Sequence, residues 1–282
     1  MKTARFVPKL LVGKGPKTEA RVREETEKLS ILRVTEQGRS KLEDVVVREF
    51  SLTIILNNQE LVTLLCSPAS LKYLAVGFLL SERLIKGKDD IKKIVVDDQK
   101  GIVQVETEKD NEFPTEPLFK RLVTSGGGRG APFYNAPDAQ AQAKVESDIE
   151  ISAHEVFALM DEFVQCSETF KATGGIHSAA LCSTKDILVF SEDIGRHNAI
   201  DKIFGECVLK GIPTEGGIII TSGRVSSEIL LKVAKRNIPL LISKSAPTNL
   251  GVRLANDLGI TVIGFARGRR MNVYTNGWRV IK

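Results

Sequence analysis

The sequence predicts an α/β fold, and two observations support this prediction. From about residue 149 onward, apolar runs of strand length alternate with amphipathic helical segments, which is typical of βαβ units and a largely parallel sheet. Residues 41–147 instead carry several strand-like runs around a single helical stripe, which indicates a smaller α+β domain. The length of 282 residues suits two ordinary domains, and 42% hydrophobic with 27% charged residues is typical of a soluble globular protein.

The N-terminal part is expected to be an extension followed by the smaller domain. Residues 1–40 are charged and mixed, and the stretch 19–29 is predicted to be a solvated helix. Ser67 is expected to cap the helix of the smaller domain, with Pro68 at its first position. The elements of this domain are predicted as strands over 45–56 and 60–66, a helix over 67–85 and a β-hairpin over 91–108.

A Gly-rich connector over residues 124–147 ends the smaller domain, and the larger domain is expected over residues 148–282. Connectors of this length tend to be functional or disordered. In the larger domain Ser152 and Glu155 have the spacing of a capping box, and Thr248 is expected to cap a later helix. Helices are predicted over 151–170, 197–210, 226–237 and 249–258, and strands over 187–193, 216–223, 239–244 and 260–266.

Charge and cysteine content restrict the class of protein. The net charge of +5 is mild; it suits an anionic small ligand and does not require nucleic acid. The four cysteines are far apart and form no CxxC or Cys/His spacing, so we expect no zinc or other metal site and reduced thiols in the cytoplasm. The N-terminus has no apolar core of a secretion signal, and no apolar run reaches transmembrane length, so no membrane partner is expected.

Five polar turns lie at predicted strand ends, where open α/β sheets bind ligands. Each one alone also fits an ordinary capped turn, and a histidine or an arginine there also fits a structural role. Together they favour a site for a small anion, because glycine amides, helix N-termini and arginine forks all bind phosphate. Nucleic acid is the less favoured ligand, because no aromatic residues are interleaved with the basic ones. The turns are TGGIHSAAL (173–181), SEDIGRHNAIDK (191–202), TSGRVSSEI (221–229), ISKSAPT (242–248) and FARGRR (265–270).

These motifs, with LAVGFLLSE upstream, closely resemble the FdhD/NarQ family of formate dehydrogenase accessory proteins over roughly residues 45–275. The resemblance implies a cytidine-deaminase-like C-terminal domain and a cytoplasmic, homodimeric maturation factor. It implies a client cofactor, molybdenum bis(molybdopterin guanine dinucleotide), and two partners, formate dehydrogenase and a cysteine desulfurase that donates sulfur. The chain lacks the HxE…PCxxC pattern of zinc deaminases, so deaminase activity is not expected.

In one loop, this chain departs from the pattern of the family that it resembles. The family usually carries a CxxC in the loop where this chain has VTSGGGRG, and the two cysteines align with Gly126 and Arg129. A persulfide relay needs a thiolate, which this loop does not contain. Three explanations stay open: the protein binds the cofactor without transferring sulfur, Cys182 or Cys166 substitutes, or a partner supplies the thiol.

The sequence therefore gives two main functional hypotheses: a sulfur-relaying accessory factor for formate dehydrogenase, or a non-enzymatic cofactor chaperone of the same family. The catalytic candidates are the substitute thiols Cys182 and Cys166 and the polar side chains of His177 and His197. The cofactor-binding candidates are Gly174, Gly175, Arg196, Ser222, Gly223, Arg224, Lys244, Phe265, Ala266, Arg267, Gly268, Arg269 and Arg270.

Overall fold

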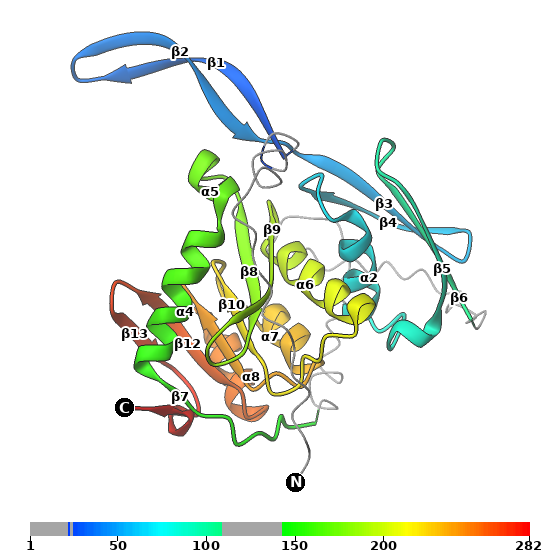
Figure 1. Ribbon diagram of the computed structural model, residues 1–282, viewed down its shortest axis with the longest axis vertical. Coiled ribbons are helices and arrows are strands. Elements are labelled where there is room, and N and C mark those ends of the chain that lie inside the picture. Colours follow the sequence, from blue (N-terminus) through cyan, green and yellow to red (C-terminus); the bar gives the residue numbers. More distant parts are fainter. Residues whose placement is uncertain (1–21, 23–24, 109–142) are drawn as a thin grey trace.

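The computed structural model describes residues 22, 25–108 and 143–282. Figure 1 shows three parts in these residues: an N-terminal two-stranded ribbon, an N-terminal lobe and a larger C-terminal lobe. The connector with Gly126 and Arg129 lies outside the described residues, and so does most of the N-terminal extension.

The C-terminal lobe is built on a six-stranded sheet in the order β13-β12-β11-β10-β8-β9. Its parallel centre is formed by β10, β11 and β12. The pairs β8–β10, β8–β9 and β12–β13 are antiparallel, so the expectation of a largely parallel sheet was wrong. The reason is that β8 and β9 form a hairpin, whereas only the later strands are joined by crossover helices. The strands are β8 (His177–Cys182), β9 (Ile187–Asp193), β10 (Ile218–Thr221), β11 (Leu240–Ser243), β12 (Thr261–Arg267) and β13 (Arg270–Val273).

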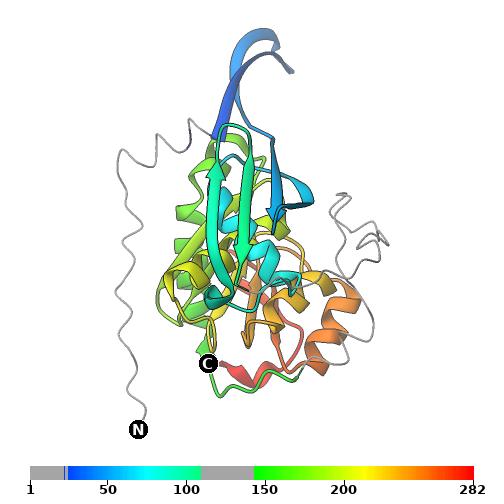
Figure 2. The ribbon, with the colours of Figure 1, turned by 90° about the vertical axis from the view of Figure 1, so that its right-hand side faces the viewer.

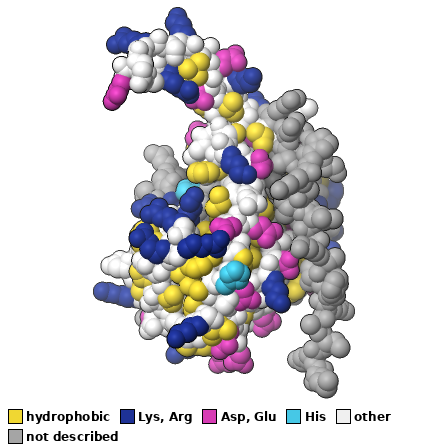
Figure 3. Space-filling view, turned by 60° about the vertical axis from the view of Figure 1, so that its left-hand side comes forward, with side chains coloured by type: hydrophobic (Ala, Val, Ile, Leu, Met, Phe, Trp, Pro, Cys, Tyr) yellow, Lys and Arg dark blue, Asp and Glu magenta, His cyan; other side chains and the backbone are white. Residues whose placement is uncertain are grey.

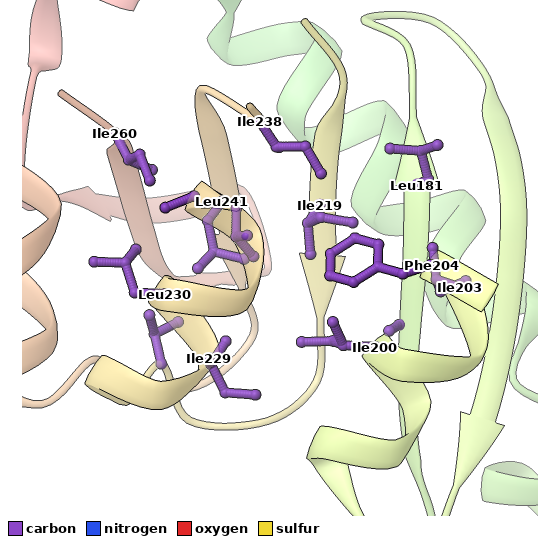
Figure 4. Close-up of a cluster of buried hydrophobic side chains, with 14 of the residues drawn as sticks. Leu181, Ile200, Ile203, Phe204, Ile219, Ile229, Leu230, Ile238, Leu241 and Ile260 are labelled. Carbon is purple, nitrogen blue, oxygen red and sulfur yellow. The ribbon is translucent and has the colours of Figure 1, made fainter. Parts of the chain in front are cut away.

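Helices cover both faces of this sheet, which gives a mixed α/β architecture. One face packs against α4 (Ala153–Cys166). The short helix α5 (Glu168–Thr173) follows α4 in the chain. The other face packs against α6 (Arg196–Lys210), α7 (Ser227–Ala234) and α8 (Asn249–Asp257). Figure 4 shows part of the core under these helices, where Phe204 of α6 lies beside Ile219 of β10; Ile229 of α7 and Leu241 of β11 belong to the same cluster. The cytidine-deaminase-like assignment of this lobe stays a prediction.

Local capping follows the sequence in this lobe. Ser152 Oγ accepts the Glu155 N–H, and the Glu155 carboxylate accepts the Ser152 N–H, so the predicted capping box is confirmed. Thr248 caps α8 by accepting the Gly251 N–H. A short parallel pair, β7 (Ile151–Ser152) and β14 (Val280–Ile281), brings the end of the chain beside the start of α4.

The N-terminal lobe has a four-stranded sheet in the order β4-β3-β6-β5. Helix α2 (Leu71–Ser81) packs on it, and Figure 2 looks onto this sheet with the helix behind. The expected strands and hairpin are confirmed, but α2 begins after Ser70, and Ser67 does not cap it. The strands are β3 (Phe50–Leu56), β4 (Gln59–Cys66), β5 (Ile91–Asp97) and β6 (Ile102–Thr107).

The N-terminal ribbon corrects a second expectation. Residues from Thr26 onward, expected as the end of a helix, form the strand β1 (Thr26–Thr35), which pairs with β2 (Gly38–Val47). Apolar and polar side chains mix along this stretch, so its periodicity is weak, and pairing with β2 decides its conformation. Buried Glu25 at its base accepts a hydrogen bond from Thr169 of α5 at 2.9 Å.

The two lobes join where α2 crosses α6. A Cβ on Gly77 of α2 would lie 1.7 Å from the carbonyl oxygen of Asp201 in α6. A Cβ on Gly205 of α6 would lie 2.0 Å from the carbonyl oxygen of Tyr73 in α2. The backbones of these helices therefore touch through two glycines, which fixes the start of α6 relative to the N-terminal lobe.

Candidate functional site

The polar turns meet at one edge of the C-terminal sheet. The carboxyl ends of the parallel strands β10 and β11 lie there, followed by Ser222 and Lys244. Because β8 is antiparallel to β10, the same edge holds His177 at the start of β8. Because β9 is antiparallel to β8, Asp193 lies opposite His177, and the turn into α6 follows. The structure thus brings together the strand ends that the sequence could only place separately.

A serine links two of these turns. Ser222 Oγ accepts the Ser178 N–H at 3.0 Å and lies 3.3 Å from His177 Nδ1. The Ser222 N–H donates back to the Ser178 carbonyl at 3.0 Å, and its own carbonyl accepts from Ser245 Oγ at 2.8 Å. This network fixes the His177 imidazole and holds the β10–α7 turn in place.

Two guanidinium groups give the edge its charge. A Cβ on Gly223 would lie 2.8 Å from Cβ of Arg196, so Arg196 packs directly on the β10–α7 turn that carries Arg224. Burial lowers the pKa of Arg196, and the charge of Arg224 lowers it further. Burial, then Arg196, also lowers the pKa of His177, so that imidazole is neutral at pH 7. The site is cationic, and it has neutral donors beside the cations.

Behind Arg196, His197 faces Glu228 of α7, with His197 Nε2 3.3 Å from Glu228 Oε2. Burial is the main cause that lowers the pKa of His197 to about 3, and Lys232 and Arg196 add to it. Burial also raises the pKa of Glu228. The contact is therefore between a neutral imidazole and a carboxyl group, and it is not an ion pair at pH 7. The His197 side chain is 20% exposed, and its Nε2 atom faces Glu228 of α7.

A fully buried ion pair holds the start of α6. Lys202 Nζ lies 2.6 Å from Asp193 Oδ2, and the two side chains are 1% and 0% exposed. Ser67 joins this pair from the N-terminal lobe: its N–H and Oγ donate to Asp193, and its Oγ accepts from Lys202. Asp193 Oδ1 accepts from the Gly195 N–H and from Asn198 Nδ2, both at 2.9 Å. This arrangement explains why Ser67 is not a helix cap.

A second polar link lies further along α6. Asp201 accepts from Lys232 of α7 and from Ser81 Oγ of α2, the latter at 2.6 Å. His197 and Asp201 are four residues apart in α6 and share a helical face, but their partners differ. Sequence reasoning missed the partner residues Asp193, Lys202, Glu228 and Lys232, because only tertiary contacts reveal them.

The FARGRR segment forms the β12–β13 hairpin. Ala266 is buried, Phe265 and Arg269 have φ of +52° and +61°, and Gly268 has φ of +57°. Arg269 lies 3.0 Å from Asp161 of α4, so this arginine already has an acidic partner, whereas Arg267 and Arg270 are exposed. The hairpin tip is therefore on the α4 side of the sheet, and Figure 3 shows Lys and Arg side chains gathered on that face.

Lys244 and the Gly174–Gly175 turn also border this side. Lys244 Nζ lies 5.4 Å from the ring centroid of Phe170 in α5, a cation–π distance. Gly174 has φ of +68° and ends α5, and a Cβ on Gly175 would lie 3.0 Å from Val47 of the ribbon. The cofactor-binding candidates thus form two groups. One group lies at the turn of Gly223 that Arg196 packs on, and the other lies near α5, at Lys244 and the Gly174–Gly175 turn.

None of the four cysteines is set up as a thiolate. Burial raises the pKa of Cys66 and Cys207 to about 12 and that of Cys166 to about 11, and it raises that of Cys182 further. Cys182 is buried at the far end of β8, away from His177, which counts against it as a substitute thiol. Cys166 is half-buried at the end of α4, beside Ser167, whose Oγ lies 2.7 Å from Ser178 Oγ. Cys66 precedes Ser67, which donates to Asp193, but Cys66 is fully buried, so Cys166 is the more accessible thiol beside the edge.

The sequence analysis expected neither a metal site nor a membrane partner. Among the described residues no group of three or more His, Cys, Asp or Glu side chains could hold a metal ion. No helix in the same part of the chain is long and apolar enough to cross a membrane.

Comparison with known proteins gives concordant matches. The chain is 44% identical over 246 residues to "Sulfur carrier protein FdhD" of Bacillus subtilis, which covers 87% of this chain and 94% of that protein. It is 41% identical over 238 residues to the protein of that name from Staphylococcus aureus, covering 84% and 90%. A crystal structure from Desulfotalea psychrophila, of a candidate formate dehydrogenase accessory protein, matches with a TM-score of 0.75 and 25% identity over 91% of this chain and 99% of that one. The family model for FdhD/NarQ matches residues 47–281, and the chain therefore belongs to the FdhD/NarQ family.

Proposed function

We propose that this protein is a cytoplasmic accessory factor for the maturation of formate dehydrogenase. Its client cofactor would be molybdenum bis(molybdopterin guanine dinucleotide), bound at the polar edge of the C-terminal sheet. The observation that carries the proposal is the packing of Arg196 on Gly223, the residue that precedes Arg224 in the β10–α7 turn at this edge. The names of the matched proteins, a sulfur carrier and a formate dehydrogenase accessory protein, support the same role.

The residues at the edge fit a ligand that carries phosphates. Arginine forks bind phosphate in two-point contacts. The absence of a side chain on Gly223 lets Arg196 pack directly against the turn that carries Arg224. Arg196, Arg224, Ser222 and Gly223 would hold one end of the ligand, and Lys244 lies at the next turn. The exposed Arg267 and Arg270 on the β12–β13 hairpin would contact a ligand that extends toward α4.

The thiols favour a chaperone over a sulfur relay. Thiolates are the reactive form of cysteine, and all four cysteines of the chain have raised pKa values. We therefore favour a role in which this protein binds and presents the cofactor and in which formate dehydrogenase is the receiving partner. The second candidate is a relay through Cys166: its thiolate would attack a persulfide of a cysteine desulfurase, take the outer sulfur, and release the desulfurase cysteine as a thiolate.

Nucleotide binding tests the site. GDP stands in for the guanine nucleotide end of the cofactor, and its affinity is measured by isothermal titration calorimetry. Because a charge-assisted hydrogen bond contributes roughly 1.5–3 kcal/mol, Arg196→Ala and Arg224→Ala should each weaken binding by about tenfold or more. Arg253→Ala, an exposed arginine on α8, is the matched control and should leave affinity unchanged. Equal affinities in all four proteins would refute this site.

Intact-protein mass spectrometry after incubation with a cysteine desulfurase and cysteine separates the two candidates. The chaperone role predicts no added sulfur on a protein that still binds GDP. Added sulfur that disappears in Cys166→Ser would establish the relay instead.

A further inference from the structure

The imidazole of His177 has one nitrogen in contact with the protein and one that reaches solvent. Nδ1 lies 3.3 Å from Ser222 Oγ in the β10–α7 turn. Nε2 has no hydrogen-bond partner among the described residues, and it is not one of the buried polar atoms left unpaired in that part of the chain. The next residue of the same turn, Gly223, has Arg196 packed on it. His177 and Arg196 are therefore neighbours on one turn, and the accessible atom of the ring is Nε2.

The hydroxyl hydrogen of Ser222 decides which nitrogen of His177 carries the proton. Ser222 Oγ already accepts the Ser178 N–H at 3.0 Å. If His177 Nδ1 also donated to this oxygen, the hydroxyl hydrogen would have no acceptor among the described residues. If the hydroxyl donates to Nδ1, every polar atom of the contact is paired, because a neutral imidazole has one donor and one acceptor nitrogen. The proton of His177 then lies on Nε2, the nitrogen that reaches solvent.

The charged groups around His177 favour its neutral form. Burial is the largest influence and lowers the pKa of this imidazole. Arg196 of α6 lowers that pKa further, Asp193 of β9 opposes it, and Arg224 of the β10–α7 turn adds to the lowering. The exposed end of the ring is therefore an N–H donor without a charge.

We propose that His177 binds a phosphate oxygen of the ligand through its Nε2–H, beside Arg196, and that Ser222 is the positioning residue that fixes this tautomer. The donor role rests on the proposed function, because it requires a phosphate-bearing ligand at the edge, whereas the tautomer does not. A neutral donor adds a hydrogen bond to the site without the repulsion that another cation would meet from Arg196. Because the ring is already oriented, little ordering is needed when the ligand binds.

Nitrogen-15 NMR of the histidine rings tests the tautomer without any ligand. The chain has three histidines, His154, His177 and His197, so the signal of His177 is assigned by its loss in His177→Gln. At pH 7 the parent protein should show a proton on Nε2 of His177 and none on Nδ1. In Ser222→Ala the other tautomer should also be populated, and Ser222→Thr, which keeps a hydroxyl, should restore the parent spectrum. The exposed His154 is the internal control and should be the same in all these proteins. A proton on Nδ1, or a charged imidazole at pH 7, would overturn the proposal.

Calorimetric titration with GDP tests the donor role. Because one neutral hydrogen bond is lost, His177→Phe should weaken GDP binding by about two- to tenfold. His177→Gln keeps an amide donor and should weaken it less. Ser222→Ala should also weaken binding, but it should cause no further loss in the His177→Phe background, because Ser222 acts through His177. His154→Phe, a change of the same kind at an exposed position of α4, is the matched control and should bind as the parent does.

The outcomes separate this inference from the proposed function. Equal GDP affinity in the parent protein and in His177→Phe would overturn the donor role and leave the arginine site standing. Full additivity of Ser222→Ala and His177→Phe would overturn the positioning role of Ser222. A parent protein that does not bind GDP would overturn the proposed function and the donor role with it.

Discussion

At the scale of single residues, burial decides the chemistry of the histidines. His197 contacts Glu228, and burial is the largest influence on its pKa, ahead of the charges of Lys232 and Arg196. The outcome is a neutral imidazole that packs against α7. A charge-assisted contact between His197 and Glu228 would appear only in acid, where it competes with the loss of the fold.

The pH dependence of stability follows from this. The pKa of His197 is about 3 in the folded protein and about 6.5 when unfolded, so the unfolded state binds more protons as pH falls below about 6.5. Stability should therefore fall toward acid by up to about 1.4 kcal/mol per pH unit from this residue. The raised pKa of Glu228 acts in the opposite direction.

Urea unfolding at pH 7, 6 and 5 measures this slope. The difference between the parent protein and His197→Gln should shrink as pH falls, because only the parent loses the His197 contribution. The same comparison in a Glu228→Gln background removes the opposing carboxyl group. Parallel pH profiles for parent and variant would show that His197 is not held neutral by the fold.

At the scale of elements, the α2–α6 crossing is the most restrictive contact. We expect Gly77→Ala to destabilise the protein by about 3 kcal/mol or more, because its Cβ would lie 1.7 Å from a backbone oxygen that cannot move without shifting α6. The higher helix propensity of alanine offsets only about 1 kcal/mol of this. Thermal and urea unfolding give the change in stability.

Gly87→Ala is the matched control for this crossing. Gly87 has extended backbone, and no atom lies within 4 Å of an added Cβ. Its stability should stay within about 0.5 kcal/mol of the parent protein. If both alanine variants were equally stable, the close approach of α2 and α6 would be wrong.

Elements also show what the sequence can and cannot predict. The caps at Ser152 and Thr248 were predictable because both partners lie within three residues in the sequence. Ser67 was assigned to a cap because its real partner, Asp193, is 126 residues away. The directions of β8 and β9 were not predictable either, since hydrophobic periodicity does not encode strand direction. Residues such as Lys202, whose role depends on a contact with a residue elsewhere in the chain, cannot be recognised from the neighbouring sequence.

At the scale of the whole molecule, the buried ion pair Asp193–Lys202 links the two lobes to the polar edge. Ser67 of the N-terminal lobe hydrogen-bonds to this pair, and Asp193 also fixes the turn before Arg196. The two lobes therefore share a polar contact whose loss affects both. We expect the described lobes to unfold together, in one transition.

Replacing Lys202 by methionine tests this connection. Lys202→Met leaves the fully buried Asp193 without its cation, which should cost about 3–5 kcal/mol of stability. Lys210→Met removes a lysine of the same helix whose side chain is 46% exposed, and it should cost less than about 1 kcal/mol. Denaturant unfolding followed by circular dichroism and by Trp278 fluorescence measures both lysine variants. Loss of stability with coincident transitions supports a shared contact, whereas an unchanged Lys202→Met protein would show that the pair does not join the lobes.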